Sequence, residues 1–214
     1  MAHLWLATGN KKKRAEMERL LGGLRMPDGS TVKLHTVDEL DEAFEVAETE
    51  PDFRGNARLK AAALAQRTGA VALADDSGLC VDALGGRPGV LSARYGGPGL
   101  DDRGRLIHLL QQMASVPDGR RAAHFTCSIC LCGPDGRVRL AVEEHCMGVM
   151  LHAPQGIGGF GYDPAFVAEA HRAEQPVRTF AELDPVAKDA VSHRGKAMRR
   201  LLDALRADPS LLQA

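Results

Sequence analysis

Residues 71–79 have the sequence VALADDSGL, in which a short apolar run leads directly into two adjacent carboxylates, a hydroxyl and a glycine. The apolar residues favour a strand that is buried on both faces. The segment that follows, Asp75-Asp76-Ser77-Gly78, has the composition of a turn, so we expect both acids at the carboxyl end of that strand, where ligands of open α/β sheets bind. Two interpretations stay open: the acids share a hard cation that offsets their repulsion, or a turn happens to use two aspartates.

The overall composition is that of an ordinary soluble globular protein, with 44% hydrophobic and 26% charged residues in a chain of 214. We expect a single domain over residues 1–214, with two lobes and no separable linker. The formal charge of -1 at pH 7 argues against a global basic field that would steer the protein to nucleic acid. No apolar run approaches the ~20 residues that span a bilayer, and the N-terminus lacks the pattern of a signal peptide. We therefore expect a cytoplasmic protein with no nucleic-acid or membrane partner.

The five cysteines are an odd number, which fits free thiols in a reducing compartment better than a disulfide framework. Cys127 and Cys130 form a CxxC pattern of the kind found in zinc and redox sites. However, residues 124–132 have the pattern of a strand, in which side chains alternate between faces, so the two cysteines would point to opposite sides of a sheet. We therefore expect buried structural thiols that share no metal.

Hydrophobic periodicity predicts strands and helices along the rest of the chain. The residues 133–136, Gly-Pro-Asp-Gly, separate two β-rich runs and predict a hairpin. Asp184 and Ser192 are placed to begin the last two helices as N-caps. The other predicted strands cover residues 3–7, 31–36, 80–84, 122–132, 137–150 and 165–167. One further helix is predicted to begin at about residue 11, and two more cover residues 56–68 and 101–113.

An anion-binding arrangement is predicted near the N-terminus, where a strand is followed by Thr8-Gly9-Asn10 and then by a helix. Glycine lets the backbone approach a ligand closely, and a helix N-terminus presents free amides with a partial positive charge. Lys11, Lys12 and Lys13 add point charges that suit phosphate. The GxxxxGK[ST] spacing of a P-loop is absent. The alternative is that the lysines are solvated on a surface helix.

Two further clusters suit a base and a phosphate group. The loop at residues 156–164 combines many glycines with Phe160, Gly161, Tyr162 and Asp163, so that a ring could stack on a base and the acid could bind its polar edge. The alternative is that its aromatics fill the core. Near the C-terminus, Lys188, His193 and Arg194 bring cationic groups to one helix junction, where a bidentate guanidinium suits phosphate or a base. The alternative there is an exposed basic helix start.

Taken together, these segments resemble one known family, the inosine/xanthosine triphosphate pyrophosphatases, which remove non-standard purine nucleotides. The similar segments occur in the same order across nearly the whole chain. They are residues 7–10 with Lys13, then Phe53, Asn56-Ala57, Lys60-Ala61, residues 74–79, Gly85-Gly86, Pro88-Gly89, residues 92–95, residues 158–164 and residues 192–195.

The resemblance implies an α/β fold with a long, curved mixed β-sheet, flanking helices and two lobes around a central nucleotide-binding cleft. It implies hydrolysis of ITP, dITP and XTP to the monophosphate and pyrophosphate with Mg²⁺, a role in nucleotide-pool sanitation, and a homodimer. By position, Asp76 is the implied general base and metal ligand. The implied substrate contacts are Thr8, Gly9, Asn10, Lys11, Lys12, Lys13, Ser77, Phe160, Gly161, Tyr162, Asp163, Lys188, His193 and Arg194.

One segment departs from the family pattern, which has a glutamate pair before a Thr-Gly. The corresponding residues here are Ala47-Glu48-Thr49-Glu50, so the first glutamate of the pair is an alanine. Glu48 is the expected second metal ligand, with Glu45 as the alternative if the loop shifts. Two other functions also stay open: a pyrophosphatase for other modified nucleotides, such as pyrimidines, and a nucleotide-binding module without catalysis.

Overall fold

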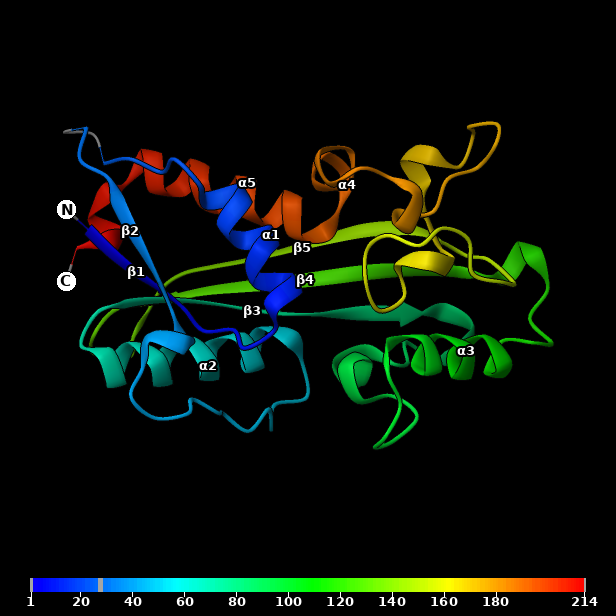
Figure 1. Ribbon diagram of the computed structural model, residues 1–214, viewed down its shortest axis with the longest axis horizontal. Coiled ribbons are helices and arrows are strands. Elements are labelled where there is room, and N and C mark those ends of the chain that lie inside the picture. Colours follow the sequence, from blue (N-terminus) through cyan, green and yellow to red (C-terminus); the bar gives the residue numbers. More distant parts are fainter. Residues whose placement is uncertain (1, 27–28, 214) are drawn as a thin grey trace. The chain divides into compact units, whose positions relative to one another are not determined.

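The computed structural model describes residues 2–26 and 29–213, in which the strands form one six-stranded sheet of order β2-β1-β3-β4-β5-β6 (Figure 1). β1 pairs in parallel with β2 and with β3, whereas β6 pairs antiparallel with β5, so the sheet is mixed. The predicted α/β fold with a mixed sheet and flanking helices is therefore confirmed. The strands are β1 (Ala2–Leu6), β2 (Val32–Thr36), β3 (Val71–Val81), β4 (Ala122–Cys132), β5 (Val138–Met150) and β6 (Phe166–Ala168).

The helices begin and end mostly where the capping residues predict. Asp101 and Asp184 accept hydrogen bonds from the first amides of their helices, and Gly69 ends a helix in the left-handed conformation with φ 63°. One start differs from the prediction, because Asp52 caps the helix and lets it begin at Phe53, ahead of Asn56. The helices are α1 (Lys11–Leu21), α2 (Phe53–Thr68), α3 (Asp102–Gln112), α4 (Pro185–Val191) and α5 (His193–Ala207).

The chain forms two compact units, and the boundary between them falls within β3. Unit 1 comprises the described residues of Met1–Asp76, Cys127–Glu143 and Ala197–Ala214, and unit 2 comprises Ser77–Thr126 and Glu144–Lys196. β3, β4 and β5 contribute residues to both units. A single domain over residues 1–214 stays a prediction.

The core of unit 1 lies on both faces of the sheet, with α2 on one face and α1 and α5 on the other (Figure 1). Alternation along β3 directs Val71 and Leu73 to the first layer and Ala72 and Ala74 to the second. Small residues on the α2 side allow the alanine-rich helix to pack closely. Buried helix residues are Met17, Leu21, Ala197, Met198, Leu201 and Leu205 on the side of α1 and α5, and Ala57, Ala61, Leu64 and Ala65 on the side of α2.

The cysteines of β4 follow the same alternation. Cys127 is buried in the layer with α1 and α5, whereas Cys130 is buried in the layer with α2. The prediction that these two thiols point to opposite faces is confirmed. Cys130 and Cys132 share a face, with their sulfur atoms 3.7 Å apart. Within the described residues, no group of three or more His, Cys, Asp or Glu side chains is arranged to hold a metal ion.

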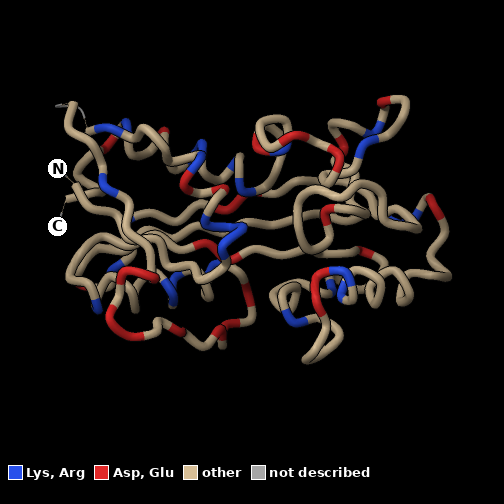
Figure 2. Tube along the Cα trace, in the orientation of Figure 1, with Lys and Arg blue, Asp and Glu red and all other residues tan. Residues whose placement is uncertain are grey.

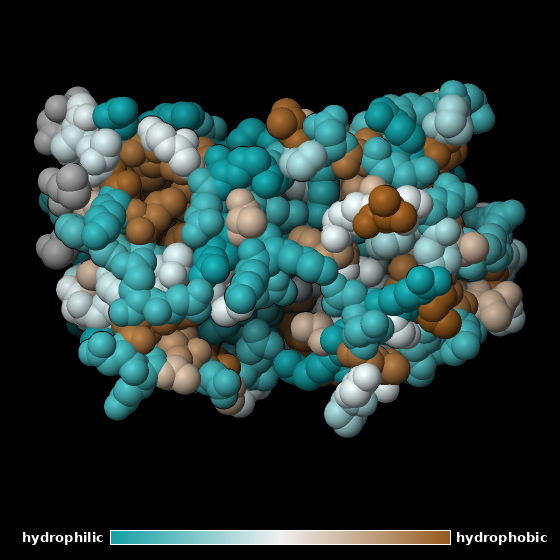
Figure 3. Space-filling model, viewed as in Figure 1, coloured by the Kyte–Doolittle hydropathy of each residue, from teal (hydrophilic) through white to brown (hydrophobic). Residues whose placement is uncertain are grey.

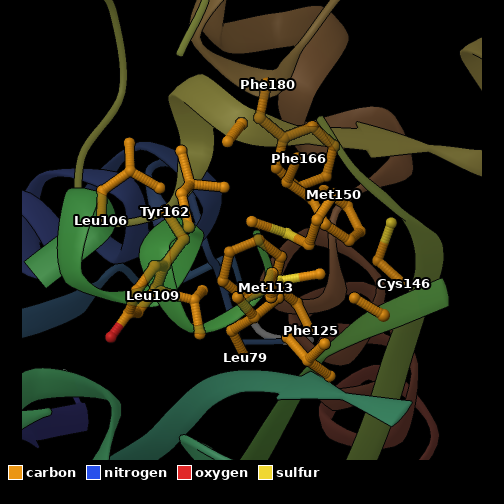
Figure 4. Close-up of a cluster of buried hydrophobic side chains, with 14 of the residues drawn as sticks. Leu79, Leu106, Leu109, Met113, Phe125, Cys146, Met150, Tyr162, Phe166 and Phe180 are labelled. Atoms are coloured by element: carbon orange, nitrogen blue, oxygen red, sulfur yellow. The ribbon is translucent and has the colours of Figure 1, made fainter. Parts of the chain in front are cut away.

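The core of unit 2 is aromatic. Phe125 packs edge-to-face on Phe166 with ring centroids 4.7 Å apart, and Phe166 packs likewise on Phe180 at 5.0 Å. α3 contributes Leu106 and Leu109 to the same cluster (Figure 4). The chain has few aromatic residues, and many of them lie in this one core. Their packing holds α3 and the segment around β6 against β3 and β4.

The acids of β3 do not lie in a turn, which corrects the prediction. β3 continues without a break from Val71 to Val81, so Asp75 to Gly78 are in the middle of an eleven-residue strand. Gly78 is needed there for space, because a Cβ atom would lie 2.4 Å from Ser92 Oγ and 2.6 Å from the Gly89 carbonyl oxygen. Tertiary contacts to residues 89–92 thus override the local turn preference. The separate strand predicted at residues 80–84 is also wrong, since residues 82–84 form a 3₁₀ turn.

The surface carries charges of both signs along the whole described chain (Figure 2), and hydrophilic side chains cover most of the face seen in Figure 3. Large hydrophobic side chains with high exposure include Met147 at 55%, Val186 at 73% and Ile157, which is fully exposed. Among the described residues there is no helix with the length and apolar character that crossing a membrane requires.

A buried arginine in unit 2 links the end of β5 to the segment that follows α3. Arg121 is 3% exposed, and its guanidinium donates to the carbonyl oxygens of Met150 at 2.7 Å, Leu151 at 2.9 Å, Met113 at 3.0 Å and Val116 at 3.1 Å. Burial lowers the pKa of Arg121. Two of these acceptors follow β5 or end it, and the other two lie just beyond α3. One side chain therefore donates to carbonyl oxygens at the ends of two elements.

We predict that Arg121→Met lowers the free energy of unfolding by about 3–5 kcal/mol, because several buried carbonyls lose a charged donor at once. Urea denaturation of the purified protein measures this. Arg120→Met is the matched control, since Arg120 is the exposed neighbour in the sequence and its loss should change the midpoint little. Equal midpoints for the two variants would contradict the structural role of Arg121.

Candidate active site

The two acids of β3 are buried and face opposite sides of the sheet. Asp75 is 1% exposed and Asp76 is 5% exposed. Asp75 lies 3.3 Å from the ammonium of Lys13 on α1, whereas Asp76 accepts a hydrogen bond of 2.9 Å from Lys60 on α2. Asp76 Oδ2 is buried and has no hydrogen-bond partner among the described residues. Strand alternation therefore separates the two carboxylates and leaves one oxygen of Asp76 able to accept a ligand.

Lys60 connects Asp76 to the acidic loop that precedes α2. Its ammonium lies 3.0 Å from Glu48 Oε1 and 2.9 Å from Asp76 Oδ1. Glu48 is thereby brought to the same cation as Asp76, whereas Glu45 is exposed. Lys60 itself was not among the predicted site residues. The only signal for it was its place in a segment that resembles the family, since helical periodicity does not distinguish it from a surface lysine.

Burial and charge compete at this carboxylate–lysine cluster. Burial raises the pKa of Asp76 above its ordinary value, although the ammonium groups of Lys60 and Lys13 act in the opposite direction. Burial would lower the pKa of Lys60, but the carboxylates of Asp76, Asp75 and Glu48 outweigh it and raise that pKa. The lysine therefore stays charged between the acids, and the cluster has the character of a cation site.

The N-terminus of α1 has the geometry that the anion-binding prediction requires. Asn10 is the N-cap, and its side chain accepts from the amides of Lys12 at 3.0 Å and Lys13 at 3.2 Å. A Cβ atom on Gly9 would meet no heavy atom within 4 Å, so the backbone there is open to a ligand. Thr8 is buried beneath this turn, and Lys11 and Lys12 are exposed. This cluster belongs to unit 1, together with Asp75, Asp76, Glu48 and Lys60.

Unit 2 gathers the predicted base-binding residues around one aromatic ring. The ammonium of Lys188 lies 4.7 Å from the ring centroid of Phe160 and 2.7 Å from Asp163 Oδ2. The same Asp163 oxygen accepts from the backbone amide of Phe160 at 2.8 Å. Asp163 and Lys188 are 3% and 6% exposed. A buried ion pair thus holds the half-buried Phe160 from both its backbone and its ring.

Arg194 and His193 lie at the start of α5. Arg194 is 2% exposed, donates to Ser77 Oγ at 2.8 Å and has its guanidinium carbon 5.9 Å from the Phe160 ring centroid. His193 stacks on Phe125 with a centroid distance of 4.7 Å. Arg194 therefore connects Ser77, the first residue of unit 2 on β3, to the ring of Phe160.

Tyr162 occupies a different environment from Phe160. It is 4% exposed and lies within the core cluster (Figure 4). Its hydroxyl donates to the Ser92 carbonyl oxygen at 2.9 Å, and burial raises its pKa. This matches the alternative that loop aromatics fill the core. The geometry supports Phe160 as the ring that stacks on a base, and direct substrate contact by Tyr162 stays a prediction.

The fold and these clusters define an α/β protein with a buried carboxylate–lysine site and an aromatic ring flanked by cations. The chain belongs to the Ham1 family, whose model matches residues 4–204. It is 50% identical over 202 residues to the dITP/XTP pyrophosphatase of Gloeobacter violaceus, covering 94% of this chain and 93% of that protein.

Two solved structures are similar to this one. A HAM1 protein from Coxiella burnetii has a TM-score of 0.81 at 38% identity, covering 96% of this chain and 98% of that one. The nucleoside-triphosphatase, or dITP/XTP pyrophosphatase, of Mycobacterium abscessus has a TM-score of 0.73 at 43% identity, covering 94% and 98% of the two chains. The likeness therefore extends over nearly the whole chain in both sequence and structure.

We predict that Lys60→Met lowers the free energy of unfolding of the metal-free protein by about 1–3 kcal/mol, and with it the unfolding temperature. The reason is that Glu48 and Asp76 lose the ammonium between them. Magnesium chloride should then raise the unfolding temperature of this variant more than that of the wild type, since a cation replaces the missing charge. Thermal unfolding with and without magnesium measures both effects.

Arg58→Met is the control on the same helix, because Arg58 pairs with Glu50 at 3.2 Å while its own side chain is 51% exposed. It should change neither the unfolding temperature nor the response to magnesium by much. The interpretation of Lys60 fails if Lys60→Met behaves like this control.

Proposed function

We propose that this protein is a nucleoside-triphosphate pyrophosphatase that hydrolyses dITP, ITP and XTP to the monophosphate and pyrophosphate, and so removes non-canonical purines from the nucleotide pool. The observation that carries the proposal is the buried carboxylate of Asp76, which shares the Lys60 ammonium with Glu48 in a chain of the Ham1 family. The names of the relatives and the cations around Phe160 support the same activity.

The residues present fit a magnesium ion. Asp76 Oδ2 is a buried oxygen without a hydrogen-bond partner in the described chain, and Glu48 supplies a second carboxylate close by. Magnesium prefers oxygen ligands and needs only one or two carboxylates when substrate phosphates supply the rest. Asp76 and Glu48 would hold it. When bound, the ion would offset negative charge on the phosphate oxygens.

The side chains of unit 1 provide the chemistry at the phosphates. Asp76 orients a water molecule and accepts its proton as the water oxygen forms a bond to the α-phosphorus. The bond from that phosphorus to the bridging oxygen of the β-phosphate breaks, and pyrophosphate leaves. Lys13 and Lys60, with the open backbone at Gly9 and the α1 N-terminus, bind the charged phosphate groups and stabilise the leaving pyrophosphate. Thr8 and Asn10 shape this turn, and Lys11 and Lys12 add positive charge around it.

The side chains of unit 2 select the base. Phe160 stacks on the purine, and the ion pair of Asp163 with Lys188 holds the Phe160 ring in place. Hydrogen-bond donors from His193, Arg194 or a backbone amide near Phe160 face the 6-oxygen of hypoxanthine or xanthine. A 6-amino group presents hydrogens to the same donors and leaves them unpaired, so adenine is rejected. Ser77 contacts the substrate beside Arg194.

We predict that the protein, supplied with Mg²⁺, releases pyrophosphate from ITP, dITP and XTP at least about 10²-fold faster than from ATP, because of the buried donors around the base. Removing magnesium with a chelator should abolish the release. A panel of these nucleotides and of modified pyrimidine triphosphates, assayed for pyrophosphate, measures this. Equal rates on ATP and ITP would contradict the base-selection model, and preference for a pyrimidine would favour the alternative pyrophosphatase.

Asp76→Asn tests the role of Asp76 in the same assay, since it keeps the size of the side chain and removes the carboxylate that acts as base and metal ligand. It should reduce turnover by about 10²- to 10⁴-fold without changing the fold measured by circular dichroism. Near-normal turnover in Asp76→Asn would refute the role of Asp76. A wild-type protein that binds ITP and releases no pyrophosphate would instead be a binding module without catalysis.

The remaining expectations concern the whole protein in the cell. The proposed protein acts as a single domain in the cytoplasm, where its five cysteines stay reduced. We predict a homodimer, as the family resemblance implies, with a mass in solution of twice the 22.9 kDa of one chain. Light scattering on the eluate of a size-exclusion column measures this mass. A single species of 22.9 kDa at micromolar concentration would contradict the dimer.

A further inference from the structure

In unit 2 the chain folds back on β3 immediately after the strand ends. Val81 donates its amide to the Arg87 carbonyl oxygen at 3.1 Å, which starts the return. Ser92 then lies against the strand, since its hydroxyl accepts from the Leu79 amide at 2.9 Å and donates to the Gly89 carbonyl oxygen at 2.6 Å. The absence of a side chain at Gly78 allows this close approach. Ser92 is therefore fixed to β3 two residues beyond Ser77.

The glycine-rich loop, residues 156–164, is hydrogen-bonded to Ser92 and to Asp102 at the start of α3. Tyr162 donates its hydroxyl to the Ser92 carbonyl oxygen at 2.9 Å, in a bond that is buried. The preceding residue, Gly161, donates its amide to Asp102 Oδ2 at 3.2 Å. The two anchors are thus consecutive residues of the loop, and they immediately follow Phe160.

The part of the loop before Phe160 is held by backbone hydrogen bonds, in which the Gln155 amide donates to the Pro164 carbonyl oxygen at 2.7 Å and the Gly158 amide donates to the Ala181 carbonyl oxygen at 3.1 Å. Residues 152–159 are exposed, and Gly156, Gly159 and Gly161 have φ values of 81°, 67° and 60°, in the region that other residues rarely adopt. Backbone freedom of this kind makes ordering costly in entropy. The bonds of Tyr162 and Asp102 reduce that cost before a ligand arrives, because they hold the backbone on the C-terminal side of Phe160.

We propose that Tyr162, Ser92 and Asp102 are positioning residues that set the ring of Phe160 relative to Ser77 and Arg194, and so connect base recognition to β3. This inference rests on the proposed function. None of the three needs to touch the base. Tyr162 acts through Ser92, whose side chain is bonded to the strand that carries Ser77, and Asp102 acts through Gly161.

The expected consequence is a change in KM with little change in kcat. Loss of the Tyr162 hydroxyl removes one of the bonds that order the backbone beside Phe160 before binding, which weakens the affinity for the base. The groups that act on the α-phosphorus belong to unit 1 and are unaltered by this change. Tyr162→Phe should therefore raise KM for ITP about 3- to 10-fold, the range expected for one buried hydrogen bond.

The chain contains a matched control, because it has only two tyrosines and both lie in the same core cluster. The hydroxyl of Tyr95 donates to Gln112 Oε1 at 2.5 Å, so its bond is made to α3 and not to Ser92. Tyr95→Phe loses a comparable hydrogen bond and should lose comparable thermal stability, yet it should keep the wild-type KM. A merely structural role for Tyr162 would give the two variants the same KM.

Asp102 supplies a second test with a conservative rescue. Asp102→Ala removes the acceptor for the Gly161 amide and should raise KM for ITP as Tyr162→Phe does, whereas Asp102→Asn keeps an oxygen acceptor and should restore it. Steady-state kinetics with ITP on all four variants gives KM and kcat separately. A wild-type KM in Tyr162→Phe, or equal KM values in Asp102→Ala and Asp102→Asn, would overturn the inference while the wild-type enzyme stays active. A wild-type protein that hydrolyses none of the nucleotides would refute the proposed function, and the inference with it.

Discussion

The close approach of residues 89–92 to Gly78 is the constraint on which the organisation of this protein depends. It keeps β3 extended through a segment whose composition favours a turn, and the strand therefore carries residues of both units. The same approach places Ser92 where its hydroxyl bonds to β3 and its carbonyl accepts from Tyr162. The absence of a side chain at Gly78 thus permits residues 89–92 to pack on the central strand and, through Ser92, to anchor the glycine-rich loop.

Because β3 stays extended, its two acids have different environments. Asp75 faces α1 and Lys13, and Asp76 faces α2 and Lys60, so each carboxylate has its own ammonium. In a turn the two would have competed for one cation. Alternation therefore explains how adjacent aspartates are tolerated in a buried strand, and why only Asp76 is placed to share a ligand with Glu48.

Most of the elements were predictable from residues that act locally. Asp101, Asp184 and Ser192 cap helices as expected, and the opposite faces of Cys127 and Cys130 follow from alternation alone. The site was predictable where residue types carry the chemistry, as with Phe160, Asp163, Lys188 and Arg194, which the structure brings together. Lys60 was missed because a lysine on an alanine-rich helix looks like a solvated one until its partners are known.

The sequence by itself determined most strands and helices, the helix caps and the kinds of group available for binding, since periodicity, capping and residue chemistry are local properties. Its resemblance to one family implied the fold class. Only the tertiary structure decided that β3 passes through the acids, that Lys60 joins Glu48 to Asp76, and that Tyr162 belongs to the core while Phe160 remains half-buried. The reason is the same in each case. These outcomes depend on which segments, distant in sequence, occupy the space beside a residue, and no local preference contains that information.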